Sequence, residues 1–226
     1  MTELASLTWT DAADLAGRGA VLVVPVGATE QHGPHLPMST DTDIAVALAE
    51  TLAREVADIV VAPAVAFGSS GEHQGFPGTL SIGQEAVELL LLELVRSATE
   101  TFPRVLLVSA HGGNAQPVTR AVRRLRGEGR SVLAWAPRWD GDAHAGRTET
   151  SVMLALAPHR VRLDAAQAGN TSPVRDLLPR LREGGLAAVT ANGVLGDPAG
   201  ANAEEGDMLL RRAAAELAHL VISRMR

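Results

Sequence analysis

Four short apolar runs alternate with longer helical patterns along most of the chain, and this alternation limits the folds available to it. The runs typical of buried strands are Val21–Val26, Ile59–Ala62, Val105–Val108 and Val132–Ala136. Strands that alternate with helices build βαβ units around a parallel sheet that is covered by helices. We therefore predict one α/β domain over residues 1–226, a single-domain three-layer α/β/α sandwich with a mainly parallel sheet.

The helical patterns between and after these runs carry apolar residues on one face. They cover Asp41–Ala57, Gln84–Thr101, Gln116–Gly127, Thr148–Ala157 and Ala203–Met225. Two long glycine-rich segments, 68–83 and 184–200, have little periodicity. Loops longer than about 12–15 residues in a compact domain are usually functional or disordered.

The residue types that the chain lacks narrow its chemistry. It has no cysteine and no tyrosine, and all 20 of its basic residues are arginine. A thiolate nucleophile, a Schiff-base lysine and a P-loop lysine are therefore excluded. Acid–base and nucleophilic chemistry is left to His, Asp, Glu, Ser, Thr and water, and a metal-activated water is a natural solution for such a chain.

Charge and hydropathy exclude two classes of partner. The formal net charge is −6 and no run of basic residues forms a patch, so we expect no nucleic-acid partner. No apolar run approaches the roughly 20 residues that span a bilayer, and the first residues lack a basic segment. We therefore expect a cytoplasmic protein without a membrane partner.

Histidines and carboxylates follow the ends of the predicted strands. Glu30 and His32 follow the first strand, His111 follows the third, and His144 and Glu149 follow the fourth. Because the carboxyl ends of parallel strands lie along one edge of a sheet, we expect these side chains to converge. Glu and His suit zinc, iron or manganese, so the pattern predicts a metal site.

Each of these motifs also has a simpler interpretation. Any single histidine could be a hydrogen-bonded loop residue, and the glycine-rich turn after His111 could hold a phosphate at a helix N-terminus. Thr148 could cap a helix, with Glu149 only favoured by the helix dipole. The segment around His73 could be an ordinary surface turn. The repetition of histidine at equivalent places in the fold favours a metal site over these alternatives.

The motifs together resemble the creatininase family of metal-dependent amidohydrolases. The matching segments, in chain order over roughly residues 20–160, are Glu30–Pro37, Thr40–Thr42, Phe76–Thr79, His111–Asn114 and His144–Ser151. A narrower similarity, to members of the family that are peptidases of a modified precursor peptide, also includes 168–171 and 193–198.

This resemblance implies a binuclear centre that holds two divalent ions per chain, either zinc or iron or both, or manganese. Glu30 and His111 would bind one ion, His32 would bind the other, and Asp41 would bridge them. The sequence does not identify the native metal.

One ligand of the family pattern is replaced. The carboxylate that follows the histidine by two residues in creatininase is Gly113 here. Glu149 is our preferred fifth ligand. Asp43 is the competing candidate, although it would point away if Asp41 begins a helix that faces the metals.

The expected chemistry is hydrolysis of an amide by a water that bridges the two ions. His144 is the candidate for proton transfer, and His73 could do the same or orient the substrate. His35 would fix a ligand from behind. Ser70, Trp139 and Arg147 are candidate substrate contacts, although Arg147 could equally be a surface arginine at a helix start.

The resemblance implies, as substrate, a modified precursor peptide that loses a C-terminal dipeptide derived from Val and Tyr. It also implies a homo-oligomer, a hexamer or a larger ring. A first alternative is an amidohydrolase of creatinine or of a formamide, which Trp135 and Trp139 favour slightly because they could stack on a small ring. A second alternative is a metal-stabilised assembly subunit without catalytic activity.

Overall fold

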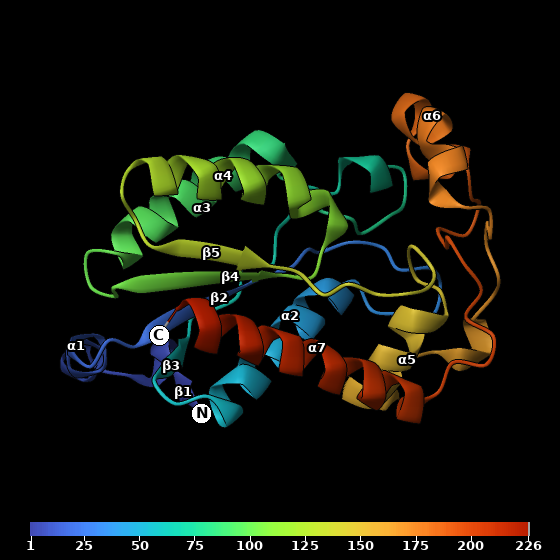
Figure 1. The fold of residues 1–226 in the computed structure, drawn as a ribbon. Coiled ribbons are helices and arrows are strands. Elements are labelled where there is room, and N and C mark those ends of the chain that lie inside the picture. The colour runs from blue at the N-terminus through green and yellow to red at the C-terminus, as the bar shows by residue number, and fades with distance from the viewer. Residues whose placement is uncertain (226) are drawn as a thin grey trace.

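Five parallel strands form one sheet at the centre of the molecule. The computed structural model describes residues 1–225. Neighbouring strands in the sheet follow the order β1-β3-β2-β4-β5, and each neighbouring pair is parallel (Figure 1). The strands are β1 (Thr2–Glu3), β2 (Val21–Val26), β3 (Ile59–Val61), β4 (Arg104–Ser109) and β5 (Val132–Trp135). The four predicted strands are confirmed within two residues at each end, and the short edge strand β1 was not predicted.

Helices cover both faces of this sheet. They are α1 (Trp9–Gly17), α2 (Thr40–Glu55), α3 (Gly83–Ala98), α4 (Ala115–Gly127), α5 (Arg147–Leu156), α6 (Val174–Gly184) and α7 (Ala203–Arg224). Helices α3 and α4 lie on one side of the sheet, and α2, α5 and α7 lie on the other (Figure 1). The predicted three-layer α/β/α architecture is confirmed.

Two apolar cores explain why β2 reads as a continuous apolar run. Val21 and Val23 belong to the core beneath α2, α5 and α7, whereas Leu22 and Val24 belong to the core beneath α3 and α4. Successive side chains of a strand point to opposite faces, so a strand covered on both sides has no polar positions. Each fully buried Val or Leu contributes roughly 1.5–3 kcal/mol to folding.

Two helices were not predicted from the sequence. Helix α1 is short and begins at a capping box in which Thr8 and Asp11 satisfy each other's backbone N–H groups. Its first residue, Trp9, is 81 % exposed, so its apolar pattern is weak. Helix α6 contains Pro179, which normally disfavours a helix interior. It lies at the periphery of the molecule, away from the sheet (Figure 1).

The helices are also unlike those that cross a bilayer. Within residues 1–225, none of them combines the length and the apolar character needed to span a membrane.

Candidate metal centre

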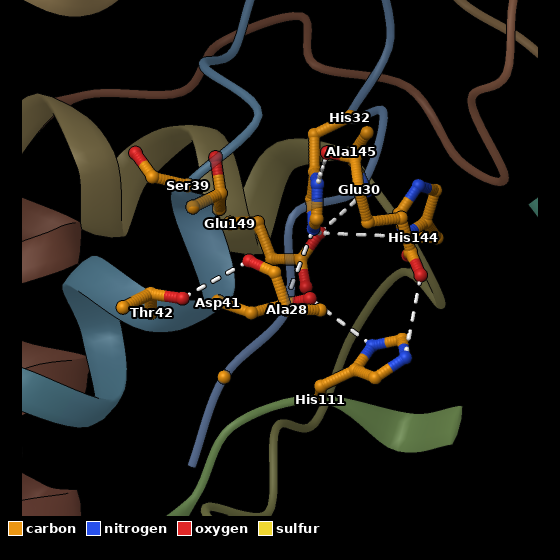
Figure 2. A network of polar contacts seen from close by, with 12 residues as sticks. Ala28, Glu30, His32, Ser39, Asp41, Thr42, His111, His144, Ala145 and Glu149 are labelled. Atoms are coloured by element: carbon orange, nitrogen blue, oxygen red, sulfur yellow. Dashed lines mark hydrogen bonds and ion pairs between the residues drawn. The ribbon is translucent and has the colours of Figure 1, made fainter. Parts of the chain in front are cut away.

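The candidate metal ligands come from four segments that meet at the carboxyl edge of the sheet (Figure 2). Glu30 and His32 lie in the loop that follows β2, and Asp41 lies in the first turn of α2. His111 comes two residues after β4, and Glu149 lies in the first turn of α5. The sheet therefore brings together residues that are far apart in the sequence, as the strand pattern predicts.

Asp41 lies between the two histidines that were expected on different metals. Its Oδ1 is 3.3 Å from Nε2 of His32, and its Oδ2 is 3.0 Å from Nδ1 of His111. The other ring nitrogen of His111, Nε2, is 3.3 Å from Oε2 of Glu30. One carboxylate that offers one oxygen to each side is the arrangement that a bridging ligand requires.

Glu149 supplies a carboxylate on the His32 side of the centre. Its Oε2 lies 3.9 Å from Nε2 of His32 and 4.0 Å from Nδ1 of His144. The same oxygen accepts a hydrogen bond from the backbone N–H of Ala145 at 2.6 Å, which fixes the side chain. Asp43 points away, because its carboxylate accepts hydrogen bonds from Ser39 and Arg160.

Close packing leaves no room for a side chain at Gly113, the position of the carboxylate in the pattern that the sequence resembles. A Cβ atom at Gly113 would lie 2.1 Å from the carbonyl oxygen of Ser69 and 2.5 Å from Nε2 of His111. Atoms that are not bonded to each other do not approach this closely, so no side chain fits there without movement of the backbone. Glu149 is the carboxylate that lies on the His32 side of the centre.

Three buried atoms of the candidate ligands are better satisfied by a cation than by their protein neighbours. Among residues 1–225, Glu30 Oε2, His32 Nε2 and Asp41 Oδ2 are buried and form no hydrogen bond of good geometry, although imidazole or carboxylate atoms lie 3.0–3.3 Å from each. An unsatisfied buried polar group typically costs about 1–3 kcal/mol, more when charged. The Nδ1–H of His32 donates to the carbonyl oxygen of Glu30 at 3.0 Å, so Nε2 is the ring nitrogen that could exchange its proton for a cation. Metal-binding histidines are typically held in this way.

The ligand atoms also lie close enough together to share cations. Three overlapping groups have ligand atoms within 4.8 Å of one another: Glu30 with Asp41 and His111, His32 with His144 and Glu149, and Glu30 with His73 and His144. The first two groups share no residue, and Asp41 contacts both, so the donor set fits two divalent ions.

The pKa values of the ligands show how strongly these groups interact. Burial raises the pKa of Glu30 to about 7. Burial also opposes charge on Asp41, but the neighbouring His32 and His111 outweigh it and hold the pKa of this carboxyl well below its usual range. Burial lowers and Asp41 raises the pKa of both imidazoles, with a net rise to about 10 for His32 and about 9 for His111. The pocket therefore favours positive charge next to Asp41.

Two further histidines border the centre and are neutral at pH 7. Burial, together with nearby His32, lowers the pKa of His73 to about 3 and that of His144 well below its ordinary value. The His144 ring lies 4.4 Å from that of His32 and 4.6 Å from that of His73, between ring centres. Nε2 of His73 is 3.2 Å from Oε1 of Glu30. Neutral imidazoles beside the candidate ligands can donate a hydrogen bond to a reacting group or accept one from it.

Two of the three candidate substrate contacts lie beside the centre. Ser70 is fully buried, and its hydroxyl oxygen is 3.2 Å from Nε2 of His111. Trp139 lines a cavity of about 380 Å³ that reaches His111 and Glu149. Arg147 is not brought to the centre, because its guanidinium pairs with Glu205 of α7 at 2.9 Å on the surface. The interpretation of Arg147 as a surface arginine describes its position better.

One neighbour of the centre has a different partner from the one expected, and another was not anticipated. His35 hydrogen-bonds no candidate ligand; its Nε2 instead contacts the hydroxyl of Thr150, the residue after Glu149, at 2.9 Å. Gln31 was not singled out in the sequence, yet it is buried and contacts both His73 and His144. Its position between Glu30 and His32 was the only available signal.

Comparisons with known proteins identify relatives of this chain. The sequence model of the family described as "Creatininase: Creatinine amidohydrolase" matches residues 5–221. The chain is 52 % identical over 196 residues to the mycofactocin precursor peptide peptidase of Mycolicibacterium smegmatis. The aligned segment covers 84 % of this chain and 79 % of that protein.

Solved structures of creatininases have a similar fold. A structure described as "Creatininase Mn" is 26 % identical with a TM-score of 0.84 and covers 99 % of this chain and 98 % of that one. A creatininase mutant described as "Zn-Zn type" has the same identity and coverage with a TM-score of 0.85.

Proposed function

Because this chain belongs to the creatininase family of metal-dependent hydrolases, we propose that it is a peptidase of the mycofactocin precursor peptide. The bond cleaved would be the amide that precedes the C-terminal dipeptide derived from Val and Tyr. The observation that carries the proposal is the 52 % identity to a relative with this name. The polar cluster of the same chain, with two groups of candidate ligands around Asp41, supports a hydrolytic site.

Two divalent ions per chain would be held by the ligands already described. Glu30 and His111 would bind one ion, His32 and Glu149 would bind the other, and Asp41 would contact both. When bound, such ions polarise a carbonyl group and lower the pKa of a water molecule. Zinc and manganese are named in the descriptions of solved creatininases, which supports these metals. Iron suits the same donor set.

His144 would carry the proton that amide hydrolysis has to move. An amine is a poor leaving group until it is protonated, so a neutral imidazole that takes up a proton and releases it to the amine helps both steps. Nδ1 of His144 lies 3.8 Å from Oε1 of Glu30, at the border of the centre. His73 would hydrogen-bond Glu30 and help to orient the substrate.

The cavity beside the centre would receive an apolar side chain of the peptide. Besides His111 and Glu149, its lining includes Trp135, Trp139 and Val118. Binding pockets are typically apolar with a few polar groups that fix orientation, and an aromatic or branched side chain near the cleaved bond suits such a lining. Ser70, whose hydroxyl oxygen lies 3.2 Å from Nε2 of His111, would hold that ring in place.

The test is an assay of purified, metal-loaded protein with the modified precursor peptide and, separately, with creatinine. Mass spectrometry should detect release of the dipeptide, and the same protein with His144→Ala serves as the control. Turnover of creatinine but not of the peptide would instead establish the alternative named in the family description. Bound metal without turnover of either compound would favour the non-catalytic assembly subunit.

We also propose that the chain forms a homo-oligomer, a hexamer or a larger ring. Helix α3 exposes Leu89, Leu90 and Leu94, whose side chains are 37–59 % accessible. Contiguous exposed apolar side chains often mark a contact with another protein chain. Light scattering of the purified protein tests this proposal, and a mass of one chain would contradict it.

A further inference from the structure

Gln31 lies between the two histidines that border the metal ligands. Its amide nitrogen is 2.9 Å from Nδ1 of His73, 3.0 Å from Nε2 of His144 and 3.1 Å from the carbonyl oxygen of Gly193. Its amide oxygen accepts the backbone N–H of Gly33 at 2.9 Å. A backbone N–H can only donate, so this contact fixes which end of the amide faces the histidines.

The hydrogens of this network can be assigned from the groups that can only accept. The amide nitrogen of Gln31 has two hydrogens, and the carbonyl oxygen of Gly193 takes one of them. Nε2 of His144 lies 2.9 Å from the carbonyl oxygen of Gln31, so this ring nitrogen carries a hydrogen and donates it. The second amide hydrogen of Gln31 then goes to Nδ1 of His73. This assignment gives a donor to both carbonyl oxygens and to His73. The 3.0 Å approach of the Gln31 amide nitrogen to Nε2 of His144 is then a contact without a hydrogen bond.

The two rings are therefore the same tautomer, with hydrogen on Nε2, but they face the centre in opposite directions. His144 turns its bare Nδ1 toward Oε1 of Glu30 at 3.8 Å and toward Oε2 of Glu149 at 4.0 Å. His73 turns its Nε2–H toward the same oxygen of Glu30 at 3.2 Å. One ring thus offers an acceptor, and the other offers a donor.

We propose that Gln31 is a positioning residue that makes His73 a hydrogen-bond donor and leaves His144 as the one neutral imidazole of the pair with a free nitrogen at the centre. While its Nδ1 is bound to Gln31, His73 presents an N–H group and cannot take up a proton or a metal ion there. Its N–H instead lies 3.2 Å from Oε1 of Glu30. The consequence for catalysis rests on the proposed hydrolase function, whereas the tautomers do not.

Gly193 gives independent support, because its loop is shaped around the Gln31 side chain. Its φ is +77°, and a Cβ atom there would lie 2.0 Å from Oε1 of Gln31. Gln31 is only 5 % exposed, so its side chain is enclosed by its neighbours and does not reach solvent. The glycine allows the 193 carbonyl to reach the Gln31 amide and to hold it against the two rings.

The test is Gln31→Glu, which keeps the size of the side chain and replaces the donor by an acceptor. With a carboxylate opposite it, Nδ1 of His73 should carry the hydrogen, and its tautomer should switch. Solid-state NMR of zinc-loaded protein with 15N-labelled histidine reports this directly, with the His73 signal assigned by its loss in His73→Asn. His144 should keep its tautomer, because its Nε2 partner is a backbone carbonyl. Gln167→Glu, an equal change at an exposed site, should leave the spectrum unchanged.

Activity gives a second readout. In Gln31→Glu, kcat for the precursor peptide should fall at least about tenfold, with KM and bound zinc within twofold of the wild type.

Hydrogen on Nδ1 of His73 in the wild type, or an unchanged His73 tautomer in Gln31→Glu, would overturn the proposal. If Gln31→Glu does not fold, Gln31→Met removes the donor without adding charge and should also increase Nδ1 protonation of His73. A tautomer switch in a protein that does not cleave the peptide would leave the positioning role intact and reject the proposed function alone.

Discussion

Oδ2 of Asp41 lies 3.0 Å from Nδ1 of His111, although one residue lies in the first turn of α2 and the other follows β4, much further along the chain. The second oxygen of the same carboxylate lies 3.3 Å from Nε2 of His32. This one side chain joins the two halves of the candidate metal centre.

Replacement of Asp41 should therefore release both ions. In Asp41→Asn, we expect metal affinity to fall at least about 100-fold, because even residues that only support a ligand change affinity by about 10–100-fold. Elemental analysis after dialysis measures the loss. Asp43→Asn is the matched control, since Asp43 pairs with Ser39 and Arg160 and should keep both equivalents. Full metal content in Asp41→Asn would remove Asp41 from the centre.

Replacement of His144 should separate proton transfer from metal binding. In His144→Ala, we expect kcat for the precursor peptide to fall by about 10²-fold or more while the metals stay bound. The comparison is with His159→Ala, which removes an exposed imidazole in the turn after α5 and should not change kcat. A normal kcat in His144→Ala would exclude His144 from the reaction.

Metal binding should be tighter at higher pH. The pKa values of His32 and His111 in the metal-free protein are raised to about 10 and 9, so both rings are protonated at pH 7. A cation competes with these protons, so affinity should rise as pH increases from about 7 to 10, and binding should release protons. Calorimetry in buffers of different ionisation enthalpy measures the proton count; no release would contradict the assignment of these ligands.

The same shifts affect the free energy of unfolding of the metal-free protein. A folded-state pKa above the ordinary histidine value stabilises the fold fully at pH below about 6.5. That contribution is lost as pH rises through the folded-state values of about 9 and 10 for His111 and His32. Denaturant unfolding of metal-free protein should therefore show decreasing stability between pH 7 and 10 from these two groups.

Two glycines with similar backbone conformations should respond differently to substitution by alanine. Gly129 has φ of +80° and no atom within 4 Å of an added Cβ, whereas at Gly193 that Cβ would meet Gln31 at 2.0 Å. Gly129→Ala should cost about 1–2 kcal/mol, from the left-handed conformation alone. Gly193→Ala should cost more and should lower kcat. Equal losses of stability and unchanged kcat in both variants would contradict the described contact.

The tryptophan of the cavity should affect substrate binding more than chemistry. In Trp139→Ala, we expect KM for the precursor peptide to rise about tenfold with little change in kcat, as for a contact made equally in the ground and transition states. Steady-state kinetics on the peptide test this. Trp9→Ala removes an 81 % exposed tryptophan of α1 and is the matched control.

The sequence predicted the layers of the fold because the apolar runs of the strands and the one-sided apolar pattern of the helices were both strong. The run Val21–Val26 has no polar residue, and it is the central strand that is buried on both faces. Helix α6 was missed because Leu177 and Leu181 pack against Leu186 and Phe76, which lie outside the helix. Pro179 within it also opposed the prediction.

The sequence also placed the histidines and carboxylates at one edge, since parallel strands must end there. It could not place Arg147, because the competing partner, Glu205, comes from a helix far along the chain. Nor could it identify the role of Gln31, whose contacts depend on three loops that approach one another only in the folded chain.

The candidate ligands are spread over four segments, and this spread links metal loading to folding. Gln31 and His144, which contact each other beside the centre, are 113 positions apart in the chain. An unfolded chain cannot present such a set. The two cations together would therefore act as removable cross-links between the loop after β2, the start of α2, the end of β4 and the start of α5. At a free metal concentration of 100 times Kd, this linkage adds about 2.7 kcal/mol per site. Removal of the metal by a chelator should then unfold the loops at this edge of the sheet first, while the strands stay folded between their two apolar cores.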